Sequence, residues 1–300
     1  MPINMQIIDN PKAERVRRVA SLTSHNARER SGRFLIEGPQ SVREAVRWRA
    51  DAVQDLYVAE SASPAVRSIE EESQRADSPI YVHHVTDAVL ERMSGDAQGI
   101  VAVGSIEAMQ TRSEELELTG AKATPAPALI AAFWQVRDPG NAGTVIRAAD
   151  AAGCAAVMLV DDCVDRFNPK TVRSTAGSLF HIPVLAIGTD DFFAFAAERS
   201  MPVWAADVYG TPSRRPEPLP DVLAADRSTG AGTGTGARGP RAVLFGNEAR
   251  GLEQSELNRC ERIVSIPIYG KAESLNLGTS AAVMLMSMAM SSHAGTILAV

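Results

Sequence analysis

The feature that most constrains the fold of this chain is a repeated alternation of short apolar segments with helix-like segments. Residues 33–37 (RFLIE) and 52–58 are strand-like, and residues 128–134 (ALIAAFW) and 156–160 repeat the pattern later in the chain. Segments with helical periodicity lie between them. Strands that alternate with helices are typical of α/β folds with a largely parallel sheet. The sequence therefore predicts an α/β protein.

Two interruptions of this alternation suggest how the chain is divided. Residues 107–127 contain a run rich in charge, Gly and Pro (TRSEELELTGAKATPAP), which is typical of a linker. Three hundred residues favour two domains. We therefore expect a smaller α/β domain at residues 1–106 and a second domain at 128–300. Within the latter, residues 209–240 are rich in Pro, Gly, Thr and Ala and are predicted to form a disordered insertion.

Composition indicates a protein of the cytoplasm. The three cysteines, Cys154, Cys163 and Cys260, are an odd number at spacings that fit neither a disulfide framework nor paired metal ligands. The first residues lack the apolar stretch of a signal peptide, and the densest apolar run, residues 281–290, is too short to cross a bilayer. We expect a soluble protein with no metal and no membrane contact.

Positive charge is concentrated at the start of the chain. Residues 1–50 hold ten Lys or Arg and five acidic residues, a net charge of +5, whereas the whole chain carries −6. A basic end on an acidic body indicates contact with a polyanion at one place, although an arginine-rich solvated helix would give the same count. The candidate residues for this contact are Lys12, Arg15, Arg17, Arg18, Arg28, Arg30 and Arg33.

Polar residues cluster where three predicted strands end. Residues 138–153 (DPGNAGTVIRAADAAG) follow the ALIAAFW strand and form a turn and a helix, with Asn141 as a candidate cap and Arg147 on an otherwise apolar segment. An arginine there must pair with a carboxylate, such as Asp150 or Asp161, or bind an anion.

The other two clusters have the same form. Residues 244–252 (LFGNEARGL) are a strand end and a glycine-rich turn with one carboxylate, Glu248. Residues 266–282 (IPIYGKAESLNLGTSAA) lead into a very apolar helix, and either Ser274 or Asn276 is placed to cap it. A cap needs only one such residue, so the surplus of polar residues predicts that this helix end lines a site.

The carboxyl ends of parallel strands meet at one sheet edge, so the three loops are expected to converge. They contain no Cys or His, which argues against metal ligation and against Ser-His or Cys-His nucleophiles. An arginine, a glutamate, amides, a serine and exposed backbone are suited to holding a cofactor by main-chain bonds and steering an anionic substrate.

A dinucleotide-like GxGxxG at residues 234–239 (GTGARG) would instead suggest a nicotinamide or flavin enzyme. That motif requires a strand before it and a helix after it, and the sequence predicts neither flank. The match follows from the low complexity of this glycine-rich run.

The three loops resemble, in order, the three motifs of the SpoU-type (TrmH-like) RNA 2′-O-methyltransferases of the SPOUT superfamily. The basic stretch from residue 10 to residue 46 resembles the ribosomal-protein-like substrate-binding domain that precedes many rRNA members. The resemblance implies a trefoil-knotted methyltransferase domain with a parallel sheet, a homodimer formed through the knot, and S-adenosylmethionine as cofactor. It places the cofactor on Gly246, Ile266 and Leu275, with Leu244 and Pro267 beside them.

The resemblance also implies a catalytic set. This comprises Arg147, Asn141, Glu248, Ser274 and Asn276. Because a guanidinium stays protonated, Arg147 is expected to position a phosphate and lower the pKa of the ribose hydroxyl rather than act as a base. Large-subunit rRNA is the expected substrate. A tRNA methyltransferase and a non-catalytic RNA-binding protein with a degenerate knot are the alternatives.

Overall fold

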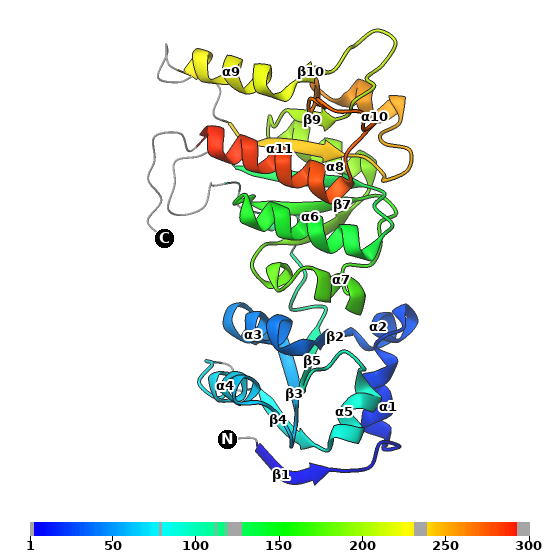
Figure 1. The fold of residues 1–300 in the computed structure, drawn as a ribbon, viewed down its shortest axis with the longest axis vertical. Coiled ribbons are helices and arrows are strands. Elements are labelled where there is room, and N and C mark those ends of the chain that lie inside the picture. Colours follow the sequence, from blue (N-terminus) through cyan, green and yellow to red (C-terminus); the bar gives the residue numbers. More distant parts are fainter. Residues whose placement is uncertain are drawn as a thin grey trace. The chain divides into compact units, whose positions relative to one another are not determined.

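The computed structural model describes residues 3–77, 80–111, 113–116, 118, 128–230 and 239–292. It divides into two compact units. Unit 1 comprises Met1–Gln110 together with Asp165–His181, and unit 2 comprises Thr111–Val164 and Ile182–Val300. The expected domains ran from 1 to 106 and from 128 to 300, so the structure assigns residues 165–181 to the other unit. Each unit has its own sheet (Figure 1).

Unit 1 is built on a five-stranded mixed sheet of order β1-β4-β3-β5-β2. β1 pairs parallel with β4, and β4 with β3, whereas β5 runs antiparallel to both β3 and β2. The first strand was not anticipated from the sequence. The strands are β1 (Ile3–Ile8), β2 (Arg33–Glu37), β3 (Val53–Ala59), β4 (Tyr81–Val85) and β5 (Ile100–Ser105).

Helices cover the unit 1 sheet because their apolar residues recur on one face. In α1 the buried residues are Val16 and Val19, and this helix packs against α5 over a core that includes Leu35, Tyr57 and Val103. The predicted basic helix is therefore amphipathic, with its arginines outside. The helices are α1 (Glu14–Ser21), α2 (His25–Ser31), α3 (Gly38–Trp48), α4 (Pro64–Ser73) and α5 (Asp87–Met93).

Residues 165–181 belong to unit 1 through buried contacts. They form α7 (Pro169–Ser174) and a 3-10 turn, Ser178–Phe180. Asp165 accepts hydrogen bonds from the guanidinium of Arg28 at 2.9 and 2.7 Å, and the ring of Phe167 lies 4.7 Å from that of Phe34. Arg173 pairs with the buried Glu37. The segment is therefore an integral part of the unit 1 core.

The pKa of Asp165 reflects this environment. Burial would raise the pKa of the carboxyl, but hydrogen bonds from the Phe167 N–H and from Arg28 outweigh burial and hold the pKa below its ordinary value. Because a lowered pKa means that the folded state favours the carboxylate, this contact stabilises unit 1 at neutral pH.

Unit 2 is built on a seven-stranded sheet of order β10-β12-β9-β11-β6-β7-β8, in which every pair is parallel. This confirms the predicted parallel sheet. β6 is buried along its whole length, as expected of a central parallel strand. The strands are β6 (Leu129–Trp134), β7 (Ala156–Val160), β8 (Val184–Ile187), β9 (Val203–Ala206), β10 (Glu217–Pro218), β11 (Arg241–Phe245) and β12 (Arg262–Ser265).

Two helices of unit 2 lie side by side and begin near the ends of the central strands. α11 packs along α6, and their contact is close enough that a Cβ on Gly278 would lie 2.6 Å from Cγ2 of Thr144 (Figure 1). The helices of this unit are α6 (Pro139–Ala151), α8 (Thr189–Glu198), α9 (Leu219–Gly230), α10 (Gln254–Arg259) and α11 (Leu277–Ser292).

The predicted disordered insertion at 209–240 is wrong for its first part. Residues 217–230 form β10 and α9, and β10 pairs with β12. Arg214 holds this region by donating hydrogen bonds to the carbonyls of Leu257, Cys260 and Glu261, in the last turn of α10 and just after it. Most of the GxGxxG stretch falls in residues 231–238, outside the described residues.

Over the described part of the chain, no helix is long and apolar enough to cross a membrane. The same residues contain no group of three or more His, Cys, Asp or Glu side chains placed to hold a metal ion. All three cysteines are free.

Candidate active site

The loop after β6 begins the site. Asp138 is the N-cap of α6, and its Oδ1 accepts a hydrogen bond from the Asn141 N–H at 2.8 Å. Pro139 follows at the first helical position, where its lack of an N–H costs nothing. The expectation that Asn141 caps this helix is therefore wrong, because the carboxylate three residues earlier takes that role and leaves the Asn141 side chain free for other contacts.

Glu248, in the loop after β11, joins this loop to the first. Its carboxylate accepts hydrogen bonds from the N–H groups of Arg137 and Asp138 at 3.4 and 3.2 Å, and from Nδ2 of Asn141 at 3.2 Å. Nδ2 of Asn247 donates to it as well, at 3.3 Å. A carboxylate surrounded by four donors anchors a loop. Glu248 makes these loop contacts and does not pair with Arg147.

Asn276 joins the third loop to the same network. Its Oδ1 accepts from the N–H groups of Gly278 and Thr279, so Asn276 caps α11, whereas Ser274 makes no capping bond. Its Nδ2 donates to Oδ1 of Asn141 at 3.2 Å. Glu248, Asn141 and Asn276 thus form one hydrogen-bonded chain that ties together the loops after β11, β6 and β12, and the expected convergence of the three loops is confirmed.

The hydrogen-bonded chain separates the five candidate catalytic residues into two groups. The polar atoms of Asn141 and Asn276 are occupied by one another, by Glu248 and by the helix cap. Arg147 and Ser274 are exposed and make no hydrogen bond or ion pair with any described residue. The pairing of Arg147 with Asp150 or Asp161, considered above, is absent. Arg147 and Ser274 are the members with groups free to contact a ligand.

A cavity of about 220 Å³ opens beside these loops at the carboxyl edge of the sheet. Gly246, Ile266 and Leu275 line it, as expected of a cofactor site. Leu244 instead lies in the core beneath, and Pro267 is not part of the lining. The lining is mixed: main chain and polar groups come from the β11 loop, and apolar side chains come from Ile268, Leu277 and Met284.

Gly246 is required by the close approach of the chain to itself. A Cβ at this position would lie 2.3 Å from the carbonyl carbon of Gly251, far inside van der Waals contact. Gly251 itself has φ +68°, and its N–H and carbonyl pair with those of Asn247. Both glycines of the LFGNEARGL turn therefore serve to close this loop over the cavity.

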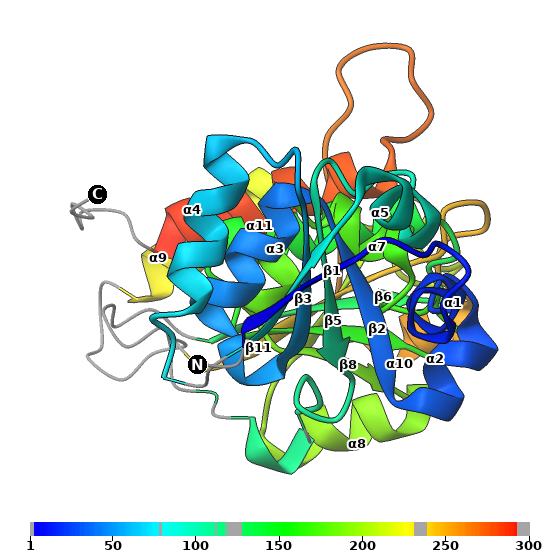
Figure 2. The same cartoon turned by 90° about the horizontal axis from the view of Figure 1, so that it is seen from below.

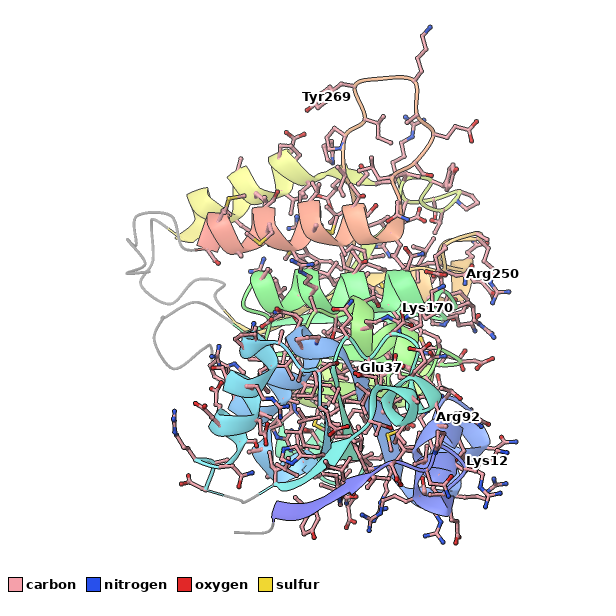
Figure 3. The ribbon with its side chains drawn as sticks, turned by 60° about the horizontal axis from the view of Figure 1, so that its bottom comes forward. Lys12, Glu37, Arg92, Lys170, Arg250 and Tyr269 are labelled. Carbon is pink, nitrogen blue, oxygen red and sulfur yellow. The ribbon has the colours of Figure 1, made fainter. Side chains whose placement is uncertain are left out.

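Two residues that line the cavity and one on the loop between β12 and α11 were missed from the sequence. Arg250 pairs with Oε1 of Gln135 and lies over the ring of Trp134. Tyr209, at the start of the insertion, lines the cavity and is largely exposed. The third, Tyr269, is 93% exposed on the long loop between β12 and α11 that projects from unit 2 (Figures 2 and 3). Arg250 could have been predicted from its position two residues after Glu248. The only sequence feature that indicated the two tyrosines was their position after strands.

Thiol chemistry does not contribute to the site at neutral pH. Burial raises the pKa of Cys163 to about 11, and those of Cys154 and Cys260 to about 12. These thiols are therefore protonated and poor nucleophiles. Of the five candidate catalytic residues, only Glu248 and Ser274 line the cavity, whereas Arg147 presents an unpaired side chain on α6 outside the lining. A free hydroxyl and the main chain of the β11 loop suit the binding of a cofactor.

The candidate RNA-binding residues lie in unit 1. Six of them, Lys12, Arg15, Arg17, Arg18, Arg30 and Arg33, are exposed. Arg28 is only 2% exposed and bonds to Asp165 and to the carbonyls of Leu22 and Thr23. Its predicted contact with RNA is wrong, because every face of its guanidinium is committed to the fold.

Comparison with known proteins places this architecture in a family. The model of the SpoU rRNA Methylase family matches residues 128–286, which include all three strand-end loops. The chain belongs to the SpoU rRNA methylase family. A second model, the MRM3-like substrate binding domain, matches residues 13–102. The family thus accounts for most of unit 2 and the substrate-binding model for most of unit 1.

Relatives of this SpoU methylase extend over nearly the whole chain. It is 29% identical over 281 residues to a protein of Bacillus subtilis named 23S rRNA (guanosine(2553)-2′-O)-methyltransferase RlmP, covering 94% of this chain and 98% of the relative. It is 31% identical to an uncharacterized tRNA/rRNA methyltransferase of Mycobacterium avium, covering 77% and 69% of the two chains. A crystal structure of an AdoMet-bound rRNA methyltransferase from Sinorhizobium meliloti shares the fold, with a TM-score of 0.76, 23% identity, and 99% and 100% coverage.

Proposed function

We propose that this protein transfers a methyl group from S-adenosylmethionine to a ribose 2′-hydroxyl of large-subunit rRNA. The observation that carries the proposal is the Glu248–Asn141–Asn276 chain, which joins three loops next to a cavity lined by residues of the β9, β11 and β12 strand ends. The Arg147 side chain on α6 makes no hydrogen bond or ion pair with the described residues. Membership of the SpoU family and likeness to the Bacillus subtilis 23S rRNA enzyme support the same reaction. The substrate would place the protein in the cytoplasm.

The lining of the cavity fits the chemistry of the proposed cofactor. An adenine and the carbon chain of the methionine moiety need apolar surface, which Ile266, Leu275 and Leu277 offer, and a nucleoside needs main-chain donors and acceptors, which the loop at Gly246 would supply. Gly246 keeps that backbone free of side-chain atoms. S-adenosylmethionine would supply an electrophilic methyl group on a sulfonium. Gly246, Ile266 and Leu275 would hold it.

Arg147 would bind the RNA phosphate next to the target ribose. A guanidinium presents a planar fork of donors that matches phosphate oxygens and remains charged throughout the reaction. Its positive charge would lower the pKa of the 2′-hydroxyl, and the bound phosphate would accept the proton. Ser274, with its free hydroxyl on the cavity lining, would contact the ligands directly. Asn141, Glu248 and Asn276 would act by keeping the loops in place.

The family resemblance extends to a trefoil knot and a homodimer, and we propose both. In the sheet, β9 lies between β11 and β12, so the chain must pass over β9 between these two strands, as a knotted topology requires. The apolar helix α11 leaves Val283 39% and Met290 63% exposed on one side. A second copy covering this face would bury them. The mass in solution measured by light scattering tests the dimer.

The experiment that tests the proposed activity measures transfer of labelled methyl from S-adenosylmethionine to unmodified rRNA and tRNA pools. The parent protein is expected to label 23S rRNA at a ribose, and Arg147→Ala is expected to abolish the label while still binding the cofactor. Arg147→Lys, which keeps the charge but loses the fork, is expected to retain only a small part of the activity. Label on tRNA alone would move the substrate to tRNA, and cofactor binding that is absent altogether would favour a non-catalytic RNA-binding protein.

A further inference from the structure

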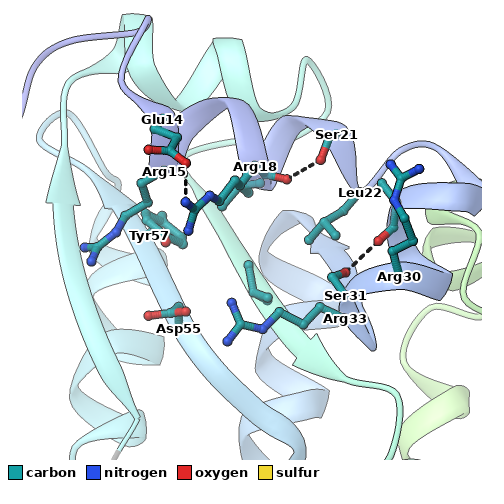
Figure 4. Close-up of a pocket in the computed structure, with 13 residues that line it drawn as sticks. Glu14, Arg15, Arg18, Ser21, Leu22, Arg30, Ser31, Arg33, Asp55 and Tyr57 are labelled. Carbon is teal, nitrogen blue, oxygen red and sulfur yellow. Dashed lines mark hydrogen bonds and ion pairs between the residues drawn. The ribbon is translucent and has the colours of Figure 1, made fainter.

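A basic cavity lies in unit 1. It has a volume of about 640 Å³ and is bounded by α1, α2 and the face of the sheet (Figure 4). We call it the arginine groove. Its lining carries four arginines and two carboxylates, and thus a net positive charge on a chain whose total charge is −6. It is lined by Glu14, Arg15, Arg18, Val19, Ser21, Leu22, Ala27, Arg30, Ser31, Arg33, Asp55, Tyr57 and Val103.

The arginines of the groove differ in how they are already engaged. Arg18 forms an exposed ion pair with Glu14 one turn earlier in α1. Arg30 and Arg33 make no hydrogen bond or ion pair with any described residue. In Figure 4 the side chains of Arg18 and Arg33 reach from α1 and from the start of β2 toward the same space in front of Asp55 and Tyr57. Such converging guanidinium groups are suited to phosphate oxygens.

A fixed acceptor lies on the floor of the groove. Nη1 of Arg15 lies 3.2 Å from Nδ1 of His83, and Nε2 of His83 lies 2.9 Å from Oδ1 of Asp55. Arginine can only donate, so Nδ1 of His83 must accept, and its Nε2–H must donate to Asp55. His83 is 1% exposed and stacks on the ring of Tyr57 at 4.8 Å. The imidazole therefore holds the carboxylate of Asp55 in one orientation.

The second oxygen of Asp55 remains available to a ligand. Oδ2 has no hydrogen-bond partner among the described residues, and 27% of the side chain is exposed. An ionised carboxylate only accepts hydrogen bonds, so its partner must be a donor. Among RNA bases, adenine, cytosine and guanine carry an exocyclic amino group, whereas uracil has only an N3–H between two carbonyl oxygens that a carboxylate would repel.

From this geometry we infer that the arginine groove binds one unpaired RNA nucleotide, with Arg18 and Arg33 on its phosphates and Asp55 reading an amino-bearing base. The volume is in the range of small-molecule sites, about 300–1,000 Å³, and base edges become accessible in single-stranded loops rather than in A-form helices. This inference rests on the proposed RNA substrate. It goes further by assigning unit 1 a base preference and not only phosphate contacts.

The test measures binding of fluorescent five-nucleotide RNAs, UUXUU with X as each of the four bases, to the full chain without cofactor. We expect the all-uridine RNA to bind on the order of tenfold more weakly than the best amino-bearing RNA. Asp55→Asn is expected to remove that difference. It keeps an oxygen to accept from His83, and thermal unfolding of the variant checks that unit 1 remains folded.

Arg33→Ala and Arg92→Ala form a matched pair. Both arginines are exposed in unit 1, but only Arg33 lines the groove. Arg33→Ala is expected to weaken binding of all four RNAs about tenfold and to lower the slope of log affinity against log salt by about 0.7, as for one lost phosphate contact on a single strand. Arg92→Ala is expected to change affinity less than twofold. Equal affinity of the parent protein for all four RNAs, or equal effects of the two variants, would overturn the inference.

The methyl-transfer assay on the same variants separates this inference from the proposed function. If the parent labels 23S rRNA, Arg33→Ala should raise the KM for RNA and leave kcat unchanged. An active parent whose KM is unaffected by Arg33→Ala would mean that the groove is not used. A parent that transfers no methyl group but still discriminates among the short RNAs would refute the proposed reaction and leave the groove assignment standing.

Discussion

The two candidate ligand sites of this protein are built in opposite ways. Around the unit 2 cavity, the polar side chains of three loops bond mainly to one another, as in the Glu248–Asn141–Asn276 chain. In the arginine groove of unit 1, the side chains of Arg30 and Arg33 make no hydrogen bond or ion pair with the described residues. The difference indicates that the first site is preorganised for a reaction that tolerates little displacement, whereas the second offers long, unrestrained side chains suited to a variable polyanion.

The largest expected effect comes from removing the free guanidinium of the preorganised site. Arg147→Ala should lower the rate of methyl transfer by about 10²–10³, the usual consequence of losing one electrostatic contact at the reacting centre. Single-turnover transfer with saturating RNA measures it. Asp150→Ala, on the same helix, is the control and should retain transfer within a few fold. An Arg147→Ala enzyme as fast as the parent would contradict the division of roles between free and bonded residues.

The rigidity of the preorganised site can be tested through its glycines. Gly246→Ala would force a methyl group to within 2.3 Å of Gly251 and should destabilise the loop by about 1–3 kcal/mol, with loss of cofactor binding. Gly270→Ala is the matched control, because a Cβ there meets no atom within 4 Å. Calorimetric titration with S-adenosylmethionine and thermal unfolding measure both. Unimpaired cofactor binding by Gly246→Ala would show that the loop can move.

In unit 1, the buried Arg28 and the exposed Arg30 are expected to differ in how much they contribute to stability. Arg28→Ala leaves the partly buried Asp165 without its arginine partner and should lower the free energy of unfolding by about 2–3 kcal/mol. Arg30→Ala should change it by less than about 0.5 kcal/mol. Denaturant unfolding measures the two free energies. If the two variants lost similar amounts of unfolding free energy, the buried Arg28–Asp165 pair would contribute no more to stability than the exposed side chain of Arg30.

The same variant gives a pH dependence of known sign. The pKa of Asp165 is lowered in the folded state, so its contribution to stability is complete above the ordinary carboxyl pKa and is lost as pH falls toward the lowered one. The difference in unfolding free energy between the parent and Arg28→Ala should therefore be largest near neutral pH and shrink below about pH 4. A difference that is constant down to pH 3 would contradict this assignment.

The smallest expected effect concerns the thiols. With the pKa of Cys163 raised to about 11 by burial, and those of Cys154 and Cys260 to about 12, the native protein should react with iodoacetamide at pH 8 far more slowly than the unfolded chain. Mass spectrometry after timed labelling measures the reaction. Rapid alkylation of Cys163 with loss of methyl transfer would mean that the site opens more readily than its bonded loops suggest.

Much of unit 2 was predictable because local and global signals agree there. Buried parallel strands are continuous apolar runs, and polar residues directly after β6, β11 and β12 could only meet at one edge of the sheet. The sequence therefore indicated the convergence of Asn141, Glu248 and Asn276. It could not indicate which residue caps α6, since Asp138 and Asn141 both have the required chemistry and only the structure shows which one the first turn uses.

Other features depend on contacts that a linear pattern does not contain. Arg28 carries the same charge as Arg30, and its burial follows from meeting Asp165, 137 residues later in the chain. The low-complexity composition of residues 209–240 predicted disorder, but β10 and α9 lie within this segment. They are held by pairing with the edge of β12 and by the hydrogen bonds of Arg214 at the end of α10. The arginine groove likewise combines residues of α1, α2 and three strands, so the sequence identified its charge but not its shape.

The position of residues 165–181 has a consequence for synthesis. Unit 1 is incomplete when its first 110 residues leave the ribosome, because Asp165, Phe167 and Arg173 complete its core and pair with its buried charges. Unit 1 can therefore complete its fold only after β6, α6 and β7 of unit 2 have been synthesised. The folding of the two units is expected to overlap in time. A fragment that ends at residue 110 would expose the buried Arg28 and Glu37 to water and should not fold as an independent domain.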